Sequence, residues 1–373
     1  MLDLTRTLCA LPGVSSREEA VREFIAQTIR PYVKWMKVDA MGNLIAFKEG
    51  KKHTGSKLLL DAHMDEVGVM VTGYTEQGCL RFAFVGGVDR RVVIGKRVYL
   101  GKEHILGVFG MKPIHQTTKE ERTAVPKVEE LYIDIGAKNK AEAQAKVKLG
   151  EVGVFDGETL LFGDGFLKGK AIDDRAGCAA MIKLAQEELP MDVTFVFSTQ
   201  EEVGTRGAFA SAFSVKPEIA LVLEATTAAD LPGTPSGKRV CAPGKGVVIP
   251  YMDGGTIYDR GLFCRLRELA EANHIPWQTK EYLSGGTNGR TYQRSRAGVR
   301  VAGLAIATPP PVWPLWRTWK GCWSWHGHSS GTSQRRADRY EETIGNLDPC
   351  PRRVRGRERH PRRHPPGSGA LRR

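Results

Sequence analysis

The sequence has 373 residues, of which 41% are hydrophobic and 26% charged, so it can form one large globular domain or two ordinary ones. No apolar run approaches the length of a membrane-spanning helix, and the first residues lack the pattern of a signal peptide. The net charge of +13 lies mostly in residues 309–373, which carry 14 Lys and Arg against 5 Asp and Glu, whereas residues 1–308 carry 41 against 37. A nucleic-acid partner is therefore not expected.

The seven cysteines are scattered, odd in number and include no CxxC pair. This usage is typical of free thiols in a reducing compartment, so we expect a cytoplasmic protein without a membrane partner.

The first part of the chain predicts a helical segment followed by strands. Residues 4–30 place apolar residues at helical spacing, and Ser15, Ser16, Glu18 and Glu19 form a pattern typical of a helix start. Strands are predicted near residues 43–47 and 57–60. Residues 66–163 then read as short strands broken by glycine, with one short helix near 138–148, which predicts an inserted β-rich domain.

From residue 164 onward strands and helices alternate. Apolar strands that alternate with helices predict an α/β fold with a mostly parallel central sheet flanked by helices on both faces. The predicted helices span about 174–188 and 259–273, and the predicted strands span about 193–198, 219–223, 246–250 and 298–307.

Acidic residues and a histidine follow several of these apolar strands. Each has an ordinary structural interpretation; Asp174, for example, is a typical helix N-cap. Ligands of open α/β sheets bind beyond the carboxyl ends of the strands, where these side chains would meet and repel one another without a cation. A pair of divalent, zinc-like ions would supply that charge. The candidates are His63 and Asp65 in KLLLDAHMDE, Asp173 and Asp174 in GKAIDDRAG, Glu201 and Glu202 in FVFSTQEEVG, and Glu224 in ALVLEATTAAD.

These motifs resemble those of the glutamyl and deblocking aminopeptidases, dinuclear-metal peptidases once also labelled endoglucanases, many of which form tetrahedral dodecamers. The similarity covers about residues 1–308 and rests on DAHMDEVG, KAIDDRAG, TQEEVGTRGA, LEATTAADLPGTP, DGGTIYDRGL and SGGTNG in the family's order. It implies a zinc-peptidase-like catalytic domain at 1–65 and 164–308, interrupted by a barrel-like dimerisation domain at 66–163. It also implies peptide substrates and a homo-oligomer built from dimers.

The resemblance implies a role for each candidate. The ligands of two divalent ions, zinc or cobalt, would be His63, Asp173, Glu202 and Glu224. Asp173 would bridge the two ions. In such sites the peptide bond that corresponds to Asp173–Asp174 is often cis. Asp65 would orient the His63 ring. Glu201 would be the general base for a metal-bridged hydroxide that releases the N-terminal residue of a peptide. Gly285, Gly286 and Thr287 would border the substrate pocket, next to Asn288, where the family usually has Asp.

One ligand of the family pattern is missing. The family's second metal-binding histidine follows the last strand, where this chain reads ATPPPVWPLW. When Trp313 to Gly327 are read one base earlier, their codons give an amphipathic pattern similar to the family's closing helix. We hypothesise that residues from about 309 onward are an aberrant basic tail produced by a frameshift. The hypothesis predicts a weakly occupied second metal site and low stability.

Other functions stay open. A dinuclear carboxypeptidase or N-acyl amino acid deacylase would use the same ligands. Because one histidine ligand is missing, an inactive relative that still forms oligomers is a further alternative. The basic tail alone would serve a nucleic-acid binder. Endoglucanase activity has little physical support, because such enzymes work with two carboxyl groups and need no metal pair.

Overall fold

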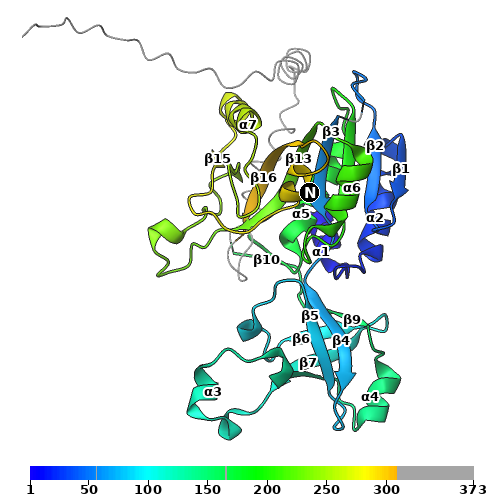
Figure 1. Ribbon diagram of the computed structural model, residues 1–373, viewed down its shortest axis with the longest axis vertical. Helices are drawn as coiled ribbons and strands as arrows, with labels where there is room; N and C mark the ends of the chain where they lie inside the picture. The colour runs from blue at the N-terminus through cyan, green and yellow to red at the C-terminus, as the bar shows by residue number, and fades with distance from the viewer. Residues whose placement is uncertain (56, 164–165, 309–373) are drawn as a thin grey trace, which may run out of the picture.

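The computed structural model describes residues 1–55, 57–163 and 166–308. They form an α/β domain built on an eight-stranded sheet and, beyond one end of it, a closed six-stranded barrel (Figure 1). The predicted frameshifted segment, 309–373, lies outside the described residues. Within the described part of the chain, no helix is long and apolar enough to cross a membrane.

The sheet of the α/β domain has the strand order β1-β2-β12-β3-β13-β16-β14-β15. The central strands β12, β3, β13 and β16 are parallel to one another, whereas β1, β2 and β14 pair antiparallel to their inner neighbours. The predicted α/β fold with a mostly parallel sheet is confirmed. The strands are β1 (Trp35–Val38), β2 (Leu44–Lys48), β3 (Leu58–His63), β12 (Val193–Ser198), β13 (Ile219–Thr227), β14 (Val247–Val248), β15 (Trp277–Gln278) and β16 (Arg300–Thr308).

Helices cover both faces of this sheet. In β12 all six residues are buried, with Phe195 and Phe197 packed among α1, α2 and α5, and Val196 packed with residues of α6 and α8. Each such buried side chain stabilises the fold by about 1.5–3 kcal/mol. The helices are α1 (Leu2–Ala10), α2 (Glu19–Ile29), α5 (Ile172–Ala185), α6 (Arg206–Val215), α7 (Arg260–Ala272) and α8 (Gly289–Gln293).

The barrel closes in the order β4-β5-β8-β7-β6-β9, with antiparallel pairs throughout. Alternate residues fill its interior, where the Phe82 and Phe109 rings meet edge to face at 5.2 Å. Its strands are β4 (Gly68–Tyr74), β5 (Leu80–Val85), β6 (Arg97–Leu100), β7 (Ile105–Met111), β8 (Leu131–Asp134) and β9 (Val152–Phe155), with short helices α3 (Lys119–Thr123) and α4 (Lys140–Lys146). The hairpin of β10 (Leu160–Phe162) and β11 (Phe166–Lys168) leads back to the α/β domain (Figure 1).

Some local elements differ from the predictions. The helical segment predicted over 4–30 is two helices, because the chain turns at residues 11–18 with Ser16 at a left-handed φ of 72°. Helix α3 and edge strand β1 were not predicted. Both are short and largely exposed, so they lack the apolar periodicity that marks a buried element.

Candidate metal centre

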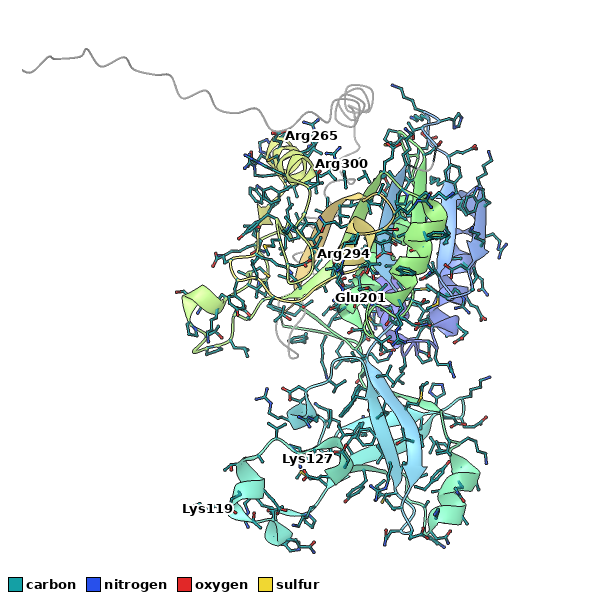
Figure 2. The ribbon with its side chains drawn as sticks, in the orientation of Figure 1. Lys119, Lys127, Glu201, Arg265, Arg294 and Arg300 are labelled. Carbon is teal, nitrogen blue, oxygen red and sulfur yellow. The ribbon has the colours of Figure 1, made fainter. Side chains whose placement is uncertain are left out.

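Neighbouring parallel strands bring the candidate side chains to one edge of the sheet. β3 ends at His63, which lies beside Ser198 at the end of β12. Glu201 and Glu202 follow β12, and Glu224 belongs to β13 on the other side of β3. Glu201 lies at the end of the α/β domain nearest the barrel (Figure 2). Because strands that run parallel end at a common edge, residues far apart in sequence converge there.

His63, Asp173 and Glu224 form a group with metal-binding geometry. Each offers one ligand atom, and the three atoms lie within 4.8 Å of one another. The His63 Nε2 atom is 3.1 Å from Asp173 Oδ1 and 3.4 Å from Glu224 Oε1. One imidazole nitrogen and two carboxylate oxygens are a donor set that divalent zinc-like ions prefer, so these residues fit a metal ion.

Asp65 contacts the His63 ring on its Nδ1 side. The Nδ1 atom of His63 lies 3.1 Å from the backbone oxygen of Asp65 and 3.4 Å from its Oδ1. Both side chains are almost completely buried. Hydrogen bonding at Nδ1 leaves Nε2 to face the acidic group, which is the usual arrangement behind a metal-binding histidine.

At the start of α5 the two adjacent aspartates, Asp173 and Asp174, have different surroundings. The Asp173 side chain is 51% exposed and faces the acidic group, whereas Asp174 is fully buried. The peptide bond between them is cis. Asp174 Oδ1 accepts the Gly177 N–H at 2.9 Å, as an N-cap does. A Cβ at position 177 would lie 2.4 Å from the Asp174 carboxylate, so this capping contact requires glycine.

The group concentrates negative charge in a buried place. Burial raises the pKa of Glu201 to about 7 and of Glu202 to about 8, and the neighbouring carboxylates of Asp173 and Asp65 add to both shifts. Burial also raises the pKa of Glu224 well above its usual range, assisted by Asp173. Burial opposes protonation of His63, yet Glu224, Asp173 and Asp65 raise its pKa well above normal. A bound cation would relieve this repulsion.

A cavity of about 370 Å³ opens beside this group. All the predicted ligands, the predicted base and the predicted substrate residues line it, whereas Asp65 lies behind it with no exposed surface. The structure therefore brings the nine predicted site residues together, and their separate roles stay predictions. The predicted residues along the wall are His63, Asp173, Glu201, Glu202, Glu224, Gly285, Gly286 and Thr287.

Three residues near the site were not assigned from the sequence. Lys280 is only 4% exposed and lines the cavity, as does Lys238; the Lys280 Nζ atom donates to the Ser284 backbone oxygen at 3.2 Å. Asn288 points away from the cavity, since its Nδ2 donates to Asp61 Oδ2 at 2.7 Å. A lysine in a loop carries no periodic signal, so only the folded chain reveals Lys238 and Lys280, whereas for Asn288 the fold reveals the contact with Asp61.

Comparison with known proteins identifies the family. A family model described as M42 glutamyl aminopeptidase matches residues 42–309. The chain belongs to this family. The lysyl aminopeptidase of Pyrococcus furiosus is 30% identical over 313 residues, which cover 82% of this chain and 88% of that relative. The predicted metal-dependent aminopeptidase, a hydrolase, is thereby confirmed at the level of the family.

Solved structures share the fold. The TET aminopeptidase of a marine sediment archaeon of the Thaumarchaeota has a TM-score of 0.79 at 30% identity, covering 83% of this chain and 88% of that one. The TET1 peptidase of Pyrococcus horikoshii has a TM-score of 0.73 at 32% identity, covering 83% and 91%. That peptidase assembles into a tetrahedron or a large octahedral shell. These neighbours support a homo-oligomeric state for the family to which this chain belongs.

Proposed function

We propose that this chain removes N-terminal residues from short peptides, using two divalent ions held by His63, Asp173, Glu202 and Glu224. The observation that carries the proposal is the meeting of His63, Asp173 and Glu224 within 4.8 Å, in a cavity also lined by Glu202 and Glu201. M42 peptidases are dinuclear metal enzymes. Zinc and cobalt are the ions that we propose, because imidazole and carboxylate ligands suit both.

Glu201 is the proposed general base. The bound ions would act as Lewis acids toward water and the scissile carbonyl. Glu201 lies in the same cavity wall as the ligands, where its carboxylate can take a proton from the attacking water and pass it to the leaving amine. The Glu201 N–H donates to Asp65 Oδ1 at 3.0 Å, which holds the main chain beneath the base. Asp65 therefore supports both the base and the His63 ligand.

The cavity favours the end of a peptide. Its volume of about 370 Å³ is at the small end of the range for small-molecule sites, which suits a short segment such as the end of a peptide. The carboxylates around Glu202 and Glu224 attract a free N-terminal ammonium. Both features suit an exopeptidase that acts from the N-terminus.

We extend the proposal to the preferred side chain. Lys280 and Lys238 are the ammonium groups in the cavity wall, opposite in charge to the carboxylates. The buried Lys280 ammonium has three donors, of which Ser284 takes one. An N-terminal glutamate or aspartate would supply the complementary carboxylate. Family members differ in preference, since the Pyrococcus furiosus relative is a lysyl aminopeptidase.

We also propose separate functions for the two domains. Residues 1–65 and 164–308 would form the catalytic domain, and residues 66–163 the dimerisation domain. The barrel supports this, because β7 turns Leu106 and Val108 outward with 45% and 40% of their surface exposed. Apolar side chains in a row on a strand exterior are typical of a contact surface. We further propose a cytoplasmic location, which the five described free cysteines support.

The frameshift hypothesis is part of the proposal for the second metal site. The family match ends at residue 309, where the hypothesis places the change of frame. Among the described residues, the second ion would then have Asp173 and Glu202 as ligands, without a second histidine. Sequencing the gene again decides the question, and an intact frame for residues 309–373 rejects it.

An activity panel tests the function. Purified chain, with added zinc, cobalt or manganese, is assayed on glutamyl-, lysyl- and leucyl-p-nitroanilide and on N-acyl amino acids, beside a version with the restored frame. We expect hydrolysis of the anilides, fastest for glutamyl, with the restored chain more active and richer in bound metal. Hydrolysis of N-acyl amino acids alone would instead favour a deacylase, and two tightly bound ions in the present chain would contradict an impaired second site.

A further inference from the structure

The loop that carries the proposed base is held by carboxylates from outside the loop. After β12 three consecutive backbone N–H groups donate to these carboxylates. The Gln200 N–H donates to Glu18 Oε1 at 3.2 Å, the Glu201 N–H to Asp65 Oδ1 at 3.0 Å, and the Glu202 N–H to Asp65 Oδ2 at 3.1 Å. Gln200 has a left-handed φ of 55°, which a non-glycine residue adopts only when its surroundings enforce it.

The two carboxylates belong to one connected cluster. Ser15 Oγ donates to Asp65 Oδ2 at 2.7 Å, and the Ser16 N–H donates to Glu18 Oε1 at 2.8 Å. Glu18 is 2% exposed, Ser15 is 2% exposed and Asp65 has no exposed surface. The turn of residues 15–18 therefore links the N-terminal helices to the loop that follows β12, about 180 residues later in the chain.

The side chain of Glu18 does not cap its own helix, α2. It occupies the N-cap position of α2, where a carboxylate commonly accepts an N–H of the first turn, yet it makes no such capping bond. Its carboxylate instead turns back to Ser16 and across to Gln200. The same burial raises the pKa of Glu18 to about 7, so the fold keeps an acid where its charged form is penalised.

We propose that Glu18 is a positioning residue for the peptidase reaction: by accepting the Gln200 N–H it fixes the backbone from which Glu201 reaches into the cavity. The inference rests on the proposed role of Glu201 as the base. Glu18 precedes the span of the family model, which begins at residue 42, whereas Gln200 and Glu201 lie within it. Loss of the Gln200 contact would leave Asp65 as the acceptor for the N–H groups of Glu201 and Glu202, while the Gln200 and Glu201 carbonyls would still accept N–H groups from residues 204–206.

Two substitutions separate positioning from bulk stability. Glu18→Ala removes the acceptor, whereas Glu18→Gln keeps an oxygen that both N–H groups can use. Glu19→Ala, at the exposed neighbouring position, is the matched control. With metal at saturation, we expect Glu18→Ala to lower kcat by about 10- to 100-fold, because small misplacement of a catalytic group costs that much. KM should change by less than about twofold, and Glu18→Gln should restore kcat to near the parent value.

Residue-resolved hydrogen exchange gives a readout that does not require activity. In Glu18→Ala the amides of residues 200–202 should exchange at least about tenfold faster, while those of β5 in the barrel stay unchanged. Unchanged exchange at 200–202, unchanged kcat, or a Glu18→Gln variant as impaired as Glu18→Ala would each overturn the inference.

The parent chain alone provides a further check should Glu18→Ala not fold. Its Gln200 amide must exchange slowly; exchange as fast as that of an exposed loop amide such as Gly233 would reject the contact. A parent chain inactive on every anilide would reject the proposed function, while the exchange measurements would still decide whether Glu18 holds the loop.

Discussion

At the scale of single residues, the site contains several buried carboxylates and few positively charged side chains to balance them. Glu201, Glu202 and Glu224 all have pKa values raised by burial, and His63 is the imidazole among them. Such a group favours either bound protons or a bound cation, because both relieve the repulsion between the carboxylates. Single substitutions here should therefore separate residues that hold metal from residues that move protons.

Glu201→Gln keeps the shape of the side chain and removes the proton acceptor. We expect kcat to fall by about 10²- to 10⁴-fold with bound metal unchanged, which is the range lost when a general base is removed. Metal analysis and steady-state kinetics measure the two effects, with exposed Glu23→Gln as control. A parallel loss of metal would reassign Glu201 as a ligand.

Lys280→Met tests the preferred substrate side chain. The substitution keeps most of the buried chain length and removes the ammonium that faces the cavity. We expect kcat/KM for glutamyl-p-nitroanilide to fall by about tenfold or more relative to leucyl-p-nitroanilide, since a charge-assisted hydrogen bond contributes about 1.5–3 kcal/mol. Equal losses on both substrates would show that Lys280 is structural.

At the scale of elements, a buried polar network joins β3 to the helices on one face of the sheet. Asp61 in β3 accepts hydrogen bonds from Asn288 at 2.7 Å and from the Tyr292 hydroxyl in α8 at 2.9 Å. The Tyr292 hydroxyl is also 2.8 Å from Ser211 Oγ in α6. Burial raises the pKa of Asp61 to about 6, although these hydrogen bonds lower it in part.

Asn288→Asp places a second carboxyl group against Asp61. The pair should share a proton, so its folded pKa lies above the unfolded aspartate value, and stability is lost as pH rises through the folded value. We expect the variant to lose about 2 kcal/mol more at pH 8 than at pH 5, since each pKa unit is worth about 1.4 kcal/mol. Thermal unfolding at both pH values measures this, and exposed Asn273→Asp should show no such difference.

At the scale of the whole molecule, the barrel lies beyond one end of the α/β domain (Figure 1). Its strand β7 exposes the apolar side chains of Leu106 and Val108. Inside the barrel, Phe82 and Phe109 complete a core of its own. A body with its own core can carry an intermolecular contact without disturbing the metal centre. This is the physical basis for assigning assembly to the barrel.

The double substitution Leu106→Lys and Val108→Lys tests that assignment. Both side chains point outward from β7, so the barrel should stay folded while charge repels the partner surface. We expect a smaller assembly by light scattering, with an unchanged circular dichroism spectrum. An unchanged assembly size would place the contact elsewhere.

The sequence alone predicted the fold class, most of the sheet strands and the candidate ligands of the site. The apolar runs of β3, β12 and β13 are continuous and local, so the sequence predicted these strands. The acids and the histidine near their ends predicted a metal site, although Glu224 lies within β13 rather than after it. Elements such as α3 and β1 escaped, because short exposed segments carry no periodic signal.

Only the tertiary structure decided which side chains meet. The approach of Lys280 to the cavity, the turn of Asn288 toward Asp61 and the reach of Glu18 to Gln200 join residues far apart along the chain. Such contacts depend on the paths that the loops take between the strands. No local pattern encodes those paths, because the free energy that fixes them comes from packing and hydrogen bonding across the whole domain.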